Sequence, residues 1–174
     1  MKTRGEIAKQ NFIFGCNCAQ AVLLAFSDVT GLDSDIAMRL ASSFGGGMGR
    51  MREVCGAVSA SLMVLGLVCG YDADAPTEKA DKAAHYARVQ ELAARFRAAQ
   101  GSIVCREILA LRAEKLRAEG ADGERDAQMD AMASTDPTPT PRTEDYYRAR
   151  PCVAVVECAA ELLDAYLCEL ERSE

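Results

Sequence analysis

The sequence predicts an all-α protein, a single-domain bundle of about six to seven helices that spans residues 1–174 and has a central apolar helix. Alternation of apolar and polar residues with period two, which is typical of a half-buried strand, is absent along the chain. Ala, Leu, Glu, Arg and Met dominate, and these residues favour helices. The length is that of one compact domain, which can bury a core without disulfides or a structural metal.

The expected helices cover, in order, residues 6–14, 18–27, 34–42, 54–68, 76–100, 103–118 and 151–171. Turn chemistry gives the first boundaries. The first helix stops at Gly15, and Asn17 with Gln20 three residues later forms a capping box that starts the second. Asp33 or Ser34 caps the third helix.

The later helices follow the same logic. The fourth is apolar on all sides, is expected at the centre of the bundle and ends at Gly70. Pro76 suits the first turn of the fifth helix, which ends before Gly101. Ser102 caps the sixth helix, and the last begins at about Pro151.

Residues 118–146 differ in composition from the rest of the chain. They hold three of the five prolines and almost no large apolar side chain. Such a segment cannot bury enough apolar surface to order itself. We therefore expect a mobile insert between two helices, without a function of its own.

The charge balance excludes several classes of function. The chain has 20 Lys and Arg against 26 Asp and Glu, a net charge of −6, and no basic cluster, so no nucleic-acid partner is expected. The uncharged stretch 54–71 is only just long enough to cross a bilayer and contains Gly and Ser, so we expect it in a protein core. Residues 1–10 lack the apolar centre of a signal peptide, which favours a cytoplasmic protein.

Cysteine is the unusual component of the sequence. Eight cysteines in a chain expected to be cytoplasmic point to metal, cluster or redox chemistry rather than to structural disulfides. Four of them fall near expected helix N-termini, where unpaired N–H groups and the helix dipole favour a thiolate: Cys18, Cys55, Cys105 and Cys152. The thiolate is both the nucleophile and the metal ligand, so these four are the candidate site residues. Each belongs to a different helix, and only tertiary packing could bring them together.

The remaining cysteines carry weaker signals. Cys69, Cys158 and Cys168 fit apolar packing positions. Cys16 lies on a turn and could join the site. His85, the only histidine, is expected on the surface or half-buried.

A glycine run, Gly45-Gly46-Gly47-Met48-Gly49, precedes the apolar helix. Such a run permits positive φ angles and close approach of the backbone to a neighbour. One interpretation is a tight crossing between helices. The other is a backbone that holds a thiolate or a cluster beside Cys55, with Gly56 next to it. The run is no phosphate loop, because no strand precedes it and Gly-Lys-Ser/Thr is missing.

These motifs together resemble the C_GCAxxG_C_C family of "putative redox-active" proteins. The matching pieces are Asn17-Cys18-Ala19-Gln20-Ala21-Val22, Phe44-Gly45-Gly46-Gly47-Met48-Gly49-Arg50, Val54-Cys55-Gly56-Ala57-Val58-Ser59, Gly101-Ser102-Ile103-Val104-Cys105-Arg106-Glu107 and Cys152. Two positions depart from the pattern. Ala60 stands where the family has Gly, and Pro151 precedes Cys152 where relatives often have Pro after the Cys, which keeps Cys158 as an alternative for the last thiol.

The resemblance implies a small helical protein with a four-cysteine site, often encoded near transporter genes. A similar module in split-Soret cytochromes is associated with an iron–sulfur site. The leading hypothesis is therefore a redox protein, in electron transfer or sensing, whose four thiolates bind an iron–sulfur cluster or, alternatively, zinc or copper.

Three alternatives stay open beside this hypothesis. The chain could be a dithiol/disulfide protein without a metal, or a non-catalytic metal-binding partner of a transporter. In a structural interpretation the cysteines only pack and the helices form a homo-oligomer surface. The redox partner is unspecified, and whether the chain is an enzyme is left open.

Overall fold

The computed structural model describes residues 2–71, 79–119 and 132–173. Its helices are α1 (Arg4–Ile13), α2 (Cys18–Ala25), α3 (Ser27–Thr30), α4 (Ser34–Ser42), α5 (Gly45–Met48), α6 (Gly56–Cys69), α7 (Lys79–Gln100), α8 (Cys105–Ala118), α10 (Glu144–Ala149) and α11 (Cys152–Ser173). Within the described ranges no strand occurs, and seven helices have at least seven residues. The predicted all-α fold is confirmed.

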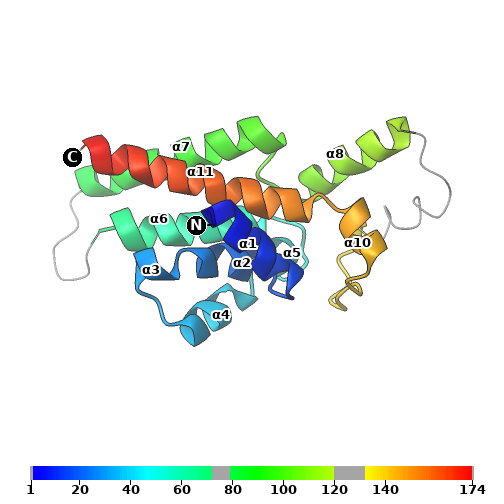
Figure 1. Cartoon of the computed structure of the whole chain (residues 1–174). Coiled ribbons are helices and arrows are strands. Elements are labelled where there is room, and N and C mark those ends of the chain that lie inside the picture. Colours follow the sequence, from blue (N-terminus) through cyan, green and yellow to red (C-terminus); the bar gives the residue numbers. More distant parts are fainter. Residues whose placement is uncertain (1, 72–78, 120–131, 174) are drawn as a thin grey trace.

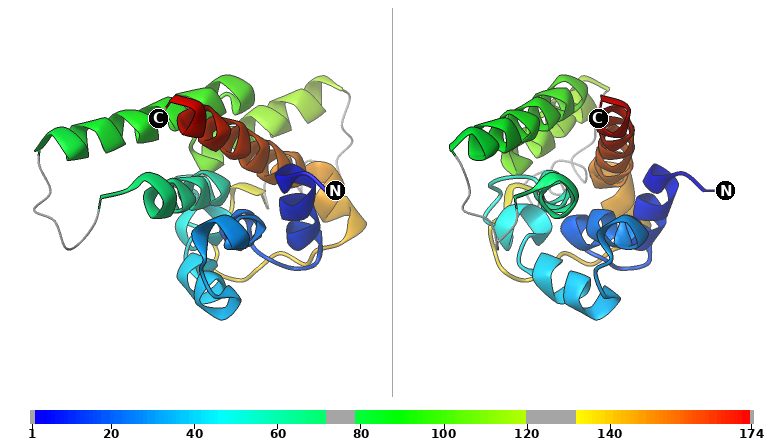
Figure 2. Two further views of the ribbon diagram at one scale, coloured as in Figure 1. Left: turned by 60° about the vertical axis from the view of Figure 1, so that its left-hand side comes forward. Right: turned by 90° about the vertical axis from the view of Figure 1, so that its left-hand side faces the viewer.

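Helix α2 lies at the centre of the bundle. It packs against α1, α4, α6 and α11, and the side chains of Ala19, Val22 and Leu23 are fully buried. The long helices α7 and α11 lie side by side along one face, and α6 lies beneath them (Figure 1). Helices α8 and α10 and the first turn of α11 gather at one end of the molecule (Figures 1 and 2).

The apolar helix α6 is central over most of its length. Ala57, Ala60, Val64 and Leu65 are buried in the core. Its last turn is different, because Leu67 and Val68 are largely exposed. No helix of the described residues is both long and apolar enough to cross a bilayer.

Local capping explains where the first helices begin. The capping box of Asn17 and Gln20 is present, and Asp33 caps α4. Helix α1 begins earlier than predicted, at Arg4, because Thr3 and Glu6 form a second capping box. The short helices α3 and α10 were not predicted.

The start of α8 differs from the prediction. Its N-cap is Val104, not Ser102. The Ser102 hydroxyl accepts a hydrogen bond from the Val104 N–H and donates to the Glu107 carboxylate, and Val104 is in an extended conformation. Val104 there forms an isolated antiparallel bridge with Val54. Pro76, predicted to start the long helix, lies outside the described residues.

The described part of the expected insert, residues 132–146, packs against the bundle. Met132 is buried. The Arg52 Nε donates to the Ser134 carbonyl at 2.9 Å, and Arg142 donates to the Phe12 and Cys16 carbonyls at 2.6 and 2.8 Å. These contacts could not be predicted from the sequence, because guanidinium-to-carbonyl bonds leave no apolar pattern. Mobility of residues 118–146 stays a prediction, and residues 120–131 lie outside the described ranges.

We expect Asn17→Ala to lower the free energy of unfolding by about 2–3 kcal/mol, more than an ordinary cap replacement. The Asn17 Oδ1 accepts from the N–H groups of Ala19 and Gln20, both at 2.9 Å. Its Nδ2 also donates to the carbonyls of Ala41 and Ser42, at 3.3 and 3.1 Å.

Urea unfolding measures this difference. The matched control is Asp33→Ala, which removes a cap that bonds only Asp35 and Ile36 at the exposed start of α4. It should cost about 1 kcal/mol. Equal losses in the two variants would contradict a role of Asn17 in holding α4 to α2.

Candidate thiol site

Four helix starts converge on one cavity. Cys18, Cys105 and Cys152 are the first residues of α2, α8 and α11, and Cys55 is the N-cap of α6. All four line a cavity of about 290 Å³. The structure therefore brings together the four cysteines that the sequence selected. Their roles as ligands or redox thiols stay predictions.

Cys18 and Cys152 line the same cavity, within hydrogen-bonding reach of each other. The hydrogen bond from the Cys152 thiol is the largest effect that lowers the pKa of Cys18, to about 7. Burial acts in the opposite direction, while the Gly46 N–H, the Arg142 charge and the N–H of Cys18 itself stabilise the thiolate. The same hydrogen bond raises the pKa of Cys152 well above its usual value. Of this pair, Cys18 is the sulfur that ionises first.

Cys55 and Cys105 lie deeper in the wall. Their residues are 5% and 9% exposed, whereas Cys18 and Cys152 are partly open to the cavity. Burial is the main effect that raises the pKa of each deep thiol, and the negative charge of Cys18 raises it further. Arg52 partly offsets the rise at Cys105. Of the four thiols on the cavity wall, Cys18 is therefore the one that ionises at the lowest pH.

The glycine run lies beside Cys18 on the cavity wall. A hydrogen bond from the Gly46 N–H lowers the pKa of Cys18, whereas the role of the glycines in holding a thiolate or a cluster stays a prediction. A Cβ at Gly47 would lie 2.6 Å from the Cβ of Cys105. A Cβ at Gly56 would lie 2.6 Å from the Phe44 carbonyl oxygen and 3.2 Å from the Cβ of Cys18. The glycines permit the sulfurs and the loop to approach each other.

The loop after these glycines is strained. Met48, Arg50 and Arg52 have positive φ angles of 58°, 70° and 61°, a region that side chains other than glycine rarely adopt. Such conformations persist where surrounding contacts fix them, and they gather at functional sites. Here the strained residues place two arginines on the cavity wall.

Arginines are the site feature that sequence reasoning missed. Arg50, Arg52, Arg142 and Arg150 line the cavity, and among the described residues no Asp or Glu does. Arg50 stands in the Gly-Met-Gly-Arg motif, which is the signal that could have pointed to it. Arg142 and Arg150 reach the cavity only through the packing of residues 132–150, for which no local pattern exists.

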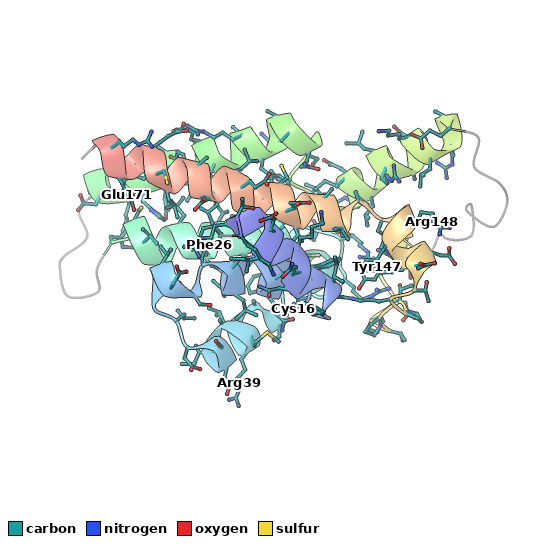
Figure 3. The ribbon with its side chains drawn as sticks, in the orientation of Figure 1. Cys16, Phe26, Arg39, Tyr147, Arg148 and Glu171 are labelled. Atoms are coloured by element: carbon teal, nitrogen blue, oxygen red, sulfur yellow. The ribbon has the colours of Figure 1, made fainter. Side chains whose placement is uncertain are left out.

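The other cysteines lie outside the cavity. Cys16, after α1, is half-buried (Figure 3), and its carbonyl accepts from Arg142. Cys69 packs against the core as predicted, and Cys158 is half-buried. Cys168 is exposed, so its predicted packing role is wrong. His85 is half-buried against the Tyr71 ring, with ring centres 5.9 Å apart, and is remote from the thiols in sequence and contact.

Metal binding is not decided by this arrangement. As their side chains stand, the described residues contain no group of three or more His, Cys, Asp or Glu that could hold a metal ion. The predicted iron–sulfur, zinc or copper ligation stays a prediction.

Comparison with known proteins gives one match. No curated protein and no solved structure matches the chain. A family model described as "Putative redox-active protein (C_GCAxxG_C_C)" matches residues 16–166. That range includes all four cavity cysteines, the glycine run and the four arginines. The chain therefore belongs to the C_GCAxxG_C_C family, which is described as "putative redox-active".

Proposed function

We propose that this chain is a thiol redox protein in which Cys18 and Cys152 form a reversible disulfide. The hydrogen bond between the two sulfurs carries the proposal, because it pairs an ionised thiol with a neighbouring thiol inside one cavity. Both residues are partly accessible, whereas Cys55 and Cys105 are buried. A low-pKa attacking sulfur beside a resolving one is the arrangement that disulfide exchange requires.

The reaction follows from these positions. The Cys18 thiolate attacks one sulfur of a substrate disulfide, which forms a mixed disulfide and releases the other substrate sulfur as a thiolate. Cys152 then loses its proton to solvent or to that thiolate and attacks the Cys18 sulfur. This second step closes the Cys18–Cys152 disulfide and releases the second substrate thiolate. The substrate gains two electrons and the protein loses two.

The surroundings of Cys18 support the first step. The N–H groups of Gly46 and of Cys18 itself and the charge of Arg142 favour the thiolate. Once Cys18 is bonded to a substrate sulfur its negative charge is gone. The negative charge of Cys18 raises the pKa of Cys55 and of Cys105, where only burial has a larger effect. The same charge also raises the pKa of Cys152. Loss of that charge therefore makes Cys152 easier to ionise when it must attack.

A metal centre is the second candidate, and it is favoured by the number of thiols on the cavity wall. Four thiol donors on four helix starts suit iron–sulfur clusters, zinc or copper(I), which prefer soft sulfur ligands. Helix N-termini and arginines would offset the negative charge of four thiolates. Such a centre would supply one-electron transfer in the cluster form, and exchangeable metal in a carrier.

The test starts from reduced protein prepared without oxygen. One sample is assayed for iron, acid-labile sulfide, zinc and copper, with visible absorption. A second, metal-free sample is treated with one equivalent of hydroxyethyl disulfide and mapped by mass spectrometry of peptides. We expect the loss of two thiols and a peptide pair joined through Cys18 and Cys152. Stoichiometric iron with sulfide, or a disulfide elsewhere, would overturn the dithiol proposal.

We expect Cys152→Ser to trap the intermediate of this reaction. Without a resolving sulfur, the mixed disulfide between Cys18 and the reagent should persist, visible as one added reagent mass. The matched control is Cys158→Ser on the same helix, which should close the disulfide like the intact protein. A trapped adduct in both variants would show that Cys158 contributes to resolution.

A further inference from the structure

The cavity around Cys18 is lined by positively charged side chains, whereas the chain as a whole is acidic. Four arginines line it, no carboxylate of the described residues does, and the chain as a whole has a net charge of −6. The thiolate at Cys18 offsets one of these positive charges. The wall is left with an excess of positive charge facing a space of about 290 Å³.

Arg52 has a donor with no partner. The residue is 3% exposed. Its Nε donates to the Ser134 carbonyl at 2.9 Å and its Nη1 to the Gly46 carbonyl at 3.4 Å, and the guanidinium also hydrogen-bonds the Cys105 sulfur. Nη2 is buried and has no hydrogen-bond partner within the described residues. A buried guanidinium N–H without an acceptor is costly, and an anion in the cavity would supply the acceptor.

Other positively charged side chains lie close to Arg52. Burial lowers the pKa of Arg50, and the positive charges of Arg52 and Arg150 lower it further. The Asp136 carboxylate and Tyr146 act in the opposite direction but have smaller effects. Asp136 is exposed and does not line the cavity. A negative group placed between these guanidiniums would relieve their mutual repulsion.

Gly46 connects the guanidiniums to the reactive sulfur. Its N–H donates to the Cys18 sulfur. A Cβ on the same residue would lie 3.0 Å from the Arg50 Cγ and 3.3 Å from the Arg52 Nη1. Arg50 and Arg52 therefore flank the residue whose N–H contacts the attacking sulfur, and the side chains of Arg50, Arg52 and Cys18 line the same cavity.

We infer that the substrate of this site is a small disulfide that carries carboxylate groups, held by Arg50 and Arg52 with its sulfurs beside Cys18. The inference rests on the proposed Cys18–Cys152 couple and adds the charge and size of its substrate. A cavity of about 290 Å³ has the size that suits a small molecule. Bidentate guanidinium contacts are the usual means of holding a carboxylate.

Three disulfides of equal chemistry and different charge test the inference: dithiodipropionate, which has two carboxylates, hydroxyethyl disulfide, which is neutral, and cystamine, which has two ammonium groups. The rate at which each disulfide oxidises Cys18 is measured at pH 7 and low salt. It is divided by the rate at which the same disulfide oxidises a small reference thiol. We expect dithiodipropionate to react about tenfold or more faster than cystamine, with a difference that shrinks as salt is added.

Variants locate the effect. Arg50→Gln should reduce the preference for dithiodipropionate over cystamine several-fold. Arg52→Gln is the second variant, with thermal unfolding as a check that it folds. The matched control is Arg39→Gln, which removes the same charge from the exposed face of α4, away from the cavity (Figure 3), and should change nothing.

Binding without chemistry gives an independent measurement. Suberate has the length of dithiodipropionate, with two methylenes in place of the sulfurs, and should bind Cys18→Ser protein in calorimetry. That binding should disappear when Arg52→Gln is added.

The outcomes separate the two proposals. Equal relative rates for the three disulfides, with no suberate binding, would overturn the inference and leave the Cys18–Cys152 couple intact. Reaction with none of the disulfides would contradict the couple itself, and suberate binding would then still decide whether the arginines hold a dicarboxylate.

Discussion

Replacing Cys18 by serine should remove the thiol that ionises near pH 7. In the intact protein, iodoacetamide should modify Cys18 with a rate that rises through a midpoint at about pH 7, because the thiol of Cys152 and the Gly46 N–H stabilise the thiolate. The sign follows from the direction of the shift. A lowered pKa means that Cys18 is already ionised at a pH where an ordinary thiol still holds its proton.

The midpoint is the diagnostic quantity, rather than the rate. At pH 7 a thiol with a pKa of about 7 is half ionised, against roughly 3% for an ordinary thiol with a pKa of about 8.5. The lower basicity of Cys18 reduces its intrinsic nucleophilicity about fivefold, so its net advantage in rate is only about threefold. Peptide mapping after timed alkylation from pH 5 to 10 separates Cys18 from the other seven cysteines.

Two variants sharpen the measurement. Cys152→Ala removes the largest effect that lowers the pKa of Cys18, so the midpoint should move upward. In Cys18→Ser, the deep thiols lose a negative neighbour and should become reactive at lower pH than in the intact protein. The control is Cys168→Ser, which removes an exposed thiol of α11 outside the cavity. A Cys18 midpoint that stays near pH 7 without Cys152 would contradict the hydrogen-bonded pair.

The four thiols could be selected from the sequence because helix starts are encoded locally. Asn17 with Gln20 fixes the start of α2, and Pro151 fixes the start of α11, so Cys18 and Cys152 fall at N-termini by short-range rules alone. For Cys105 the capping rule predicted the correct helix start but the wrong N-cap, because Val104 is the N-cap and Ser102 hydrogen-bonds the Glu107 carboxylate instead. This two-residue error in the N-cap still left Cys105 in the first turn of α8, so the predicted site did not change.

The chemistry inside the site could not be obtained in the same way. Which two sulfurs touch depends on how α2 and α11 cross, and no local pattern encodes a crossing. The arginines are beyond prediction for a related reason. Arg142 and Arg150 come from a polar, proline-rich segment, and the contacts of Arg142 are made by its guanidinium group to carbonyls of distant residues. The composition of such a segment shows that it does not belong to the hydrophobic core, but it does not show against which residues the segment packs.

The glycine run was likewise only partly predictable. The density of glycines predicted positive φ angles, and Gly46, Gly47 and Gly49 do have φ angles of 65°, 74° and 64°. The sequence could not tell what approaches them. The side chains of Arg50 and Arg52 approach Gly46, whereas Cys105 and the backbone of Arg52 and Glu53 approach Gly47. At Gly47 both the φ angle and the lack of space require glycine.

Gly47→Ala should be strongly destabilising. The φ angle of 74° costs a residue with a Cβ about 1–2 kcal/mol. The added methyl would lie 2.6 Å from the Cβ of Cys105 and 3.1 Å from both the Arg52 Cα and the Glu53 nitrogen, which adds an overpacking cost of about 1–3 kcal/mol. We expect the free energy of unfolding, measured in urea, to fall by about 2–5 kcal/mol in total.

Two other glycines separate the contributions. Gly31 has a φ of 64° and nothing within 4 Å of the position that an added methyl would take, so Gly31→Ala should show the cost of the angle alone. Gly66 lies within α6, also with open space, so Gly66→Ala should stabilise the protein by about 0.5–1 kcal/mol. If Gly47→Ala costs no more than Gly31→Ala, the loop can retreat from Cys105. In that case its close approach does not hold the cavity wall, and the alkylation midpoint of Cys18 should also stay unchanged.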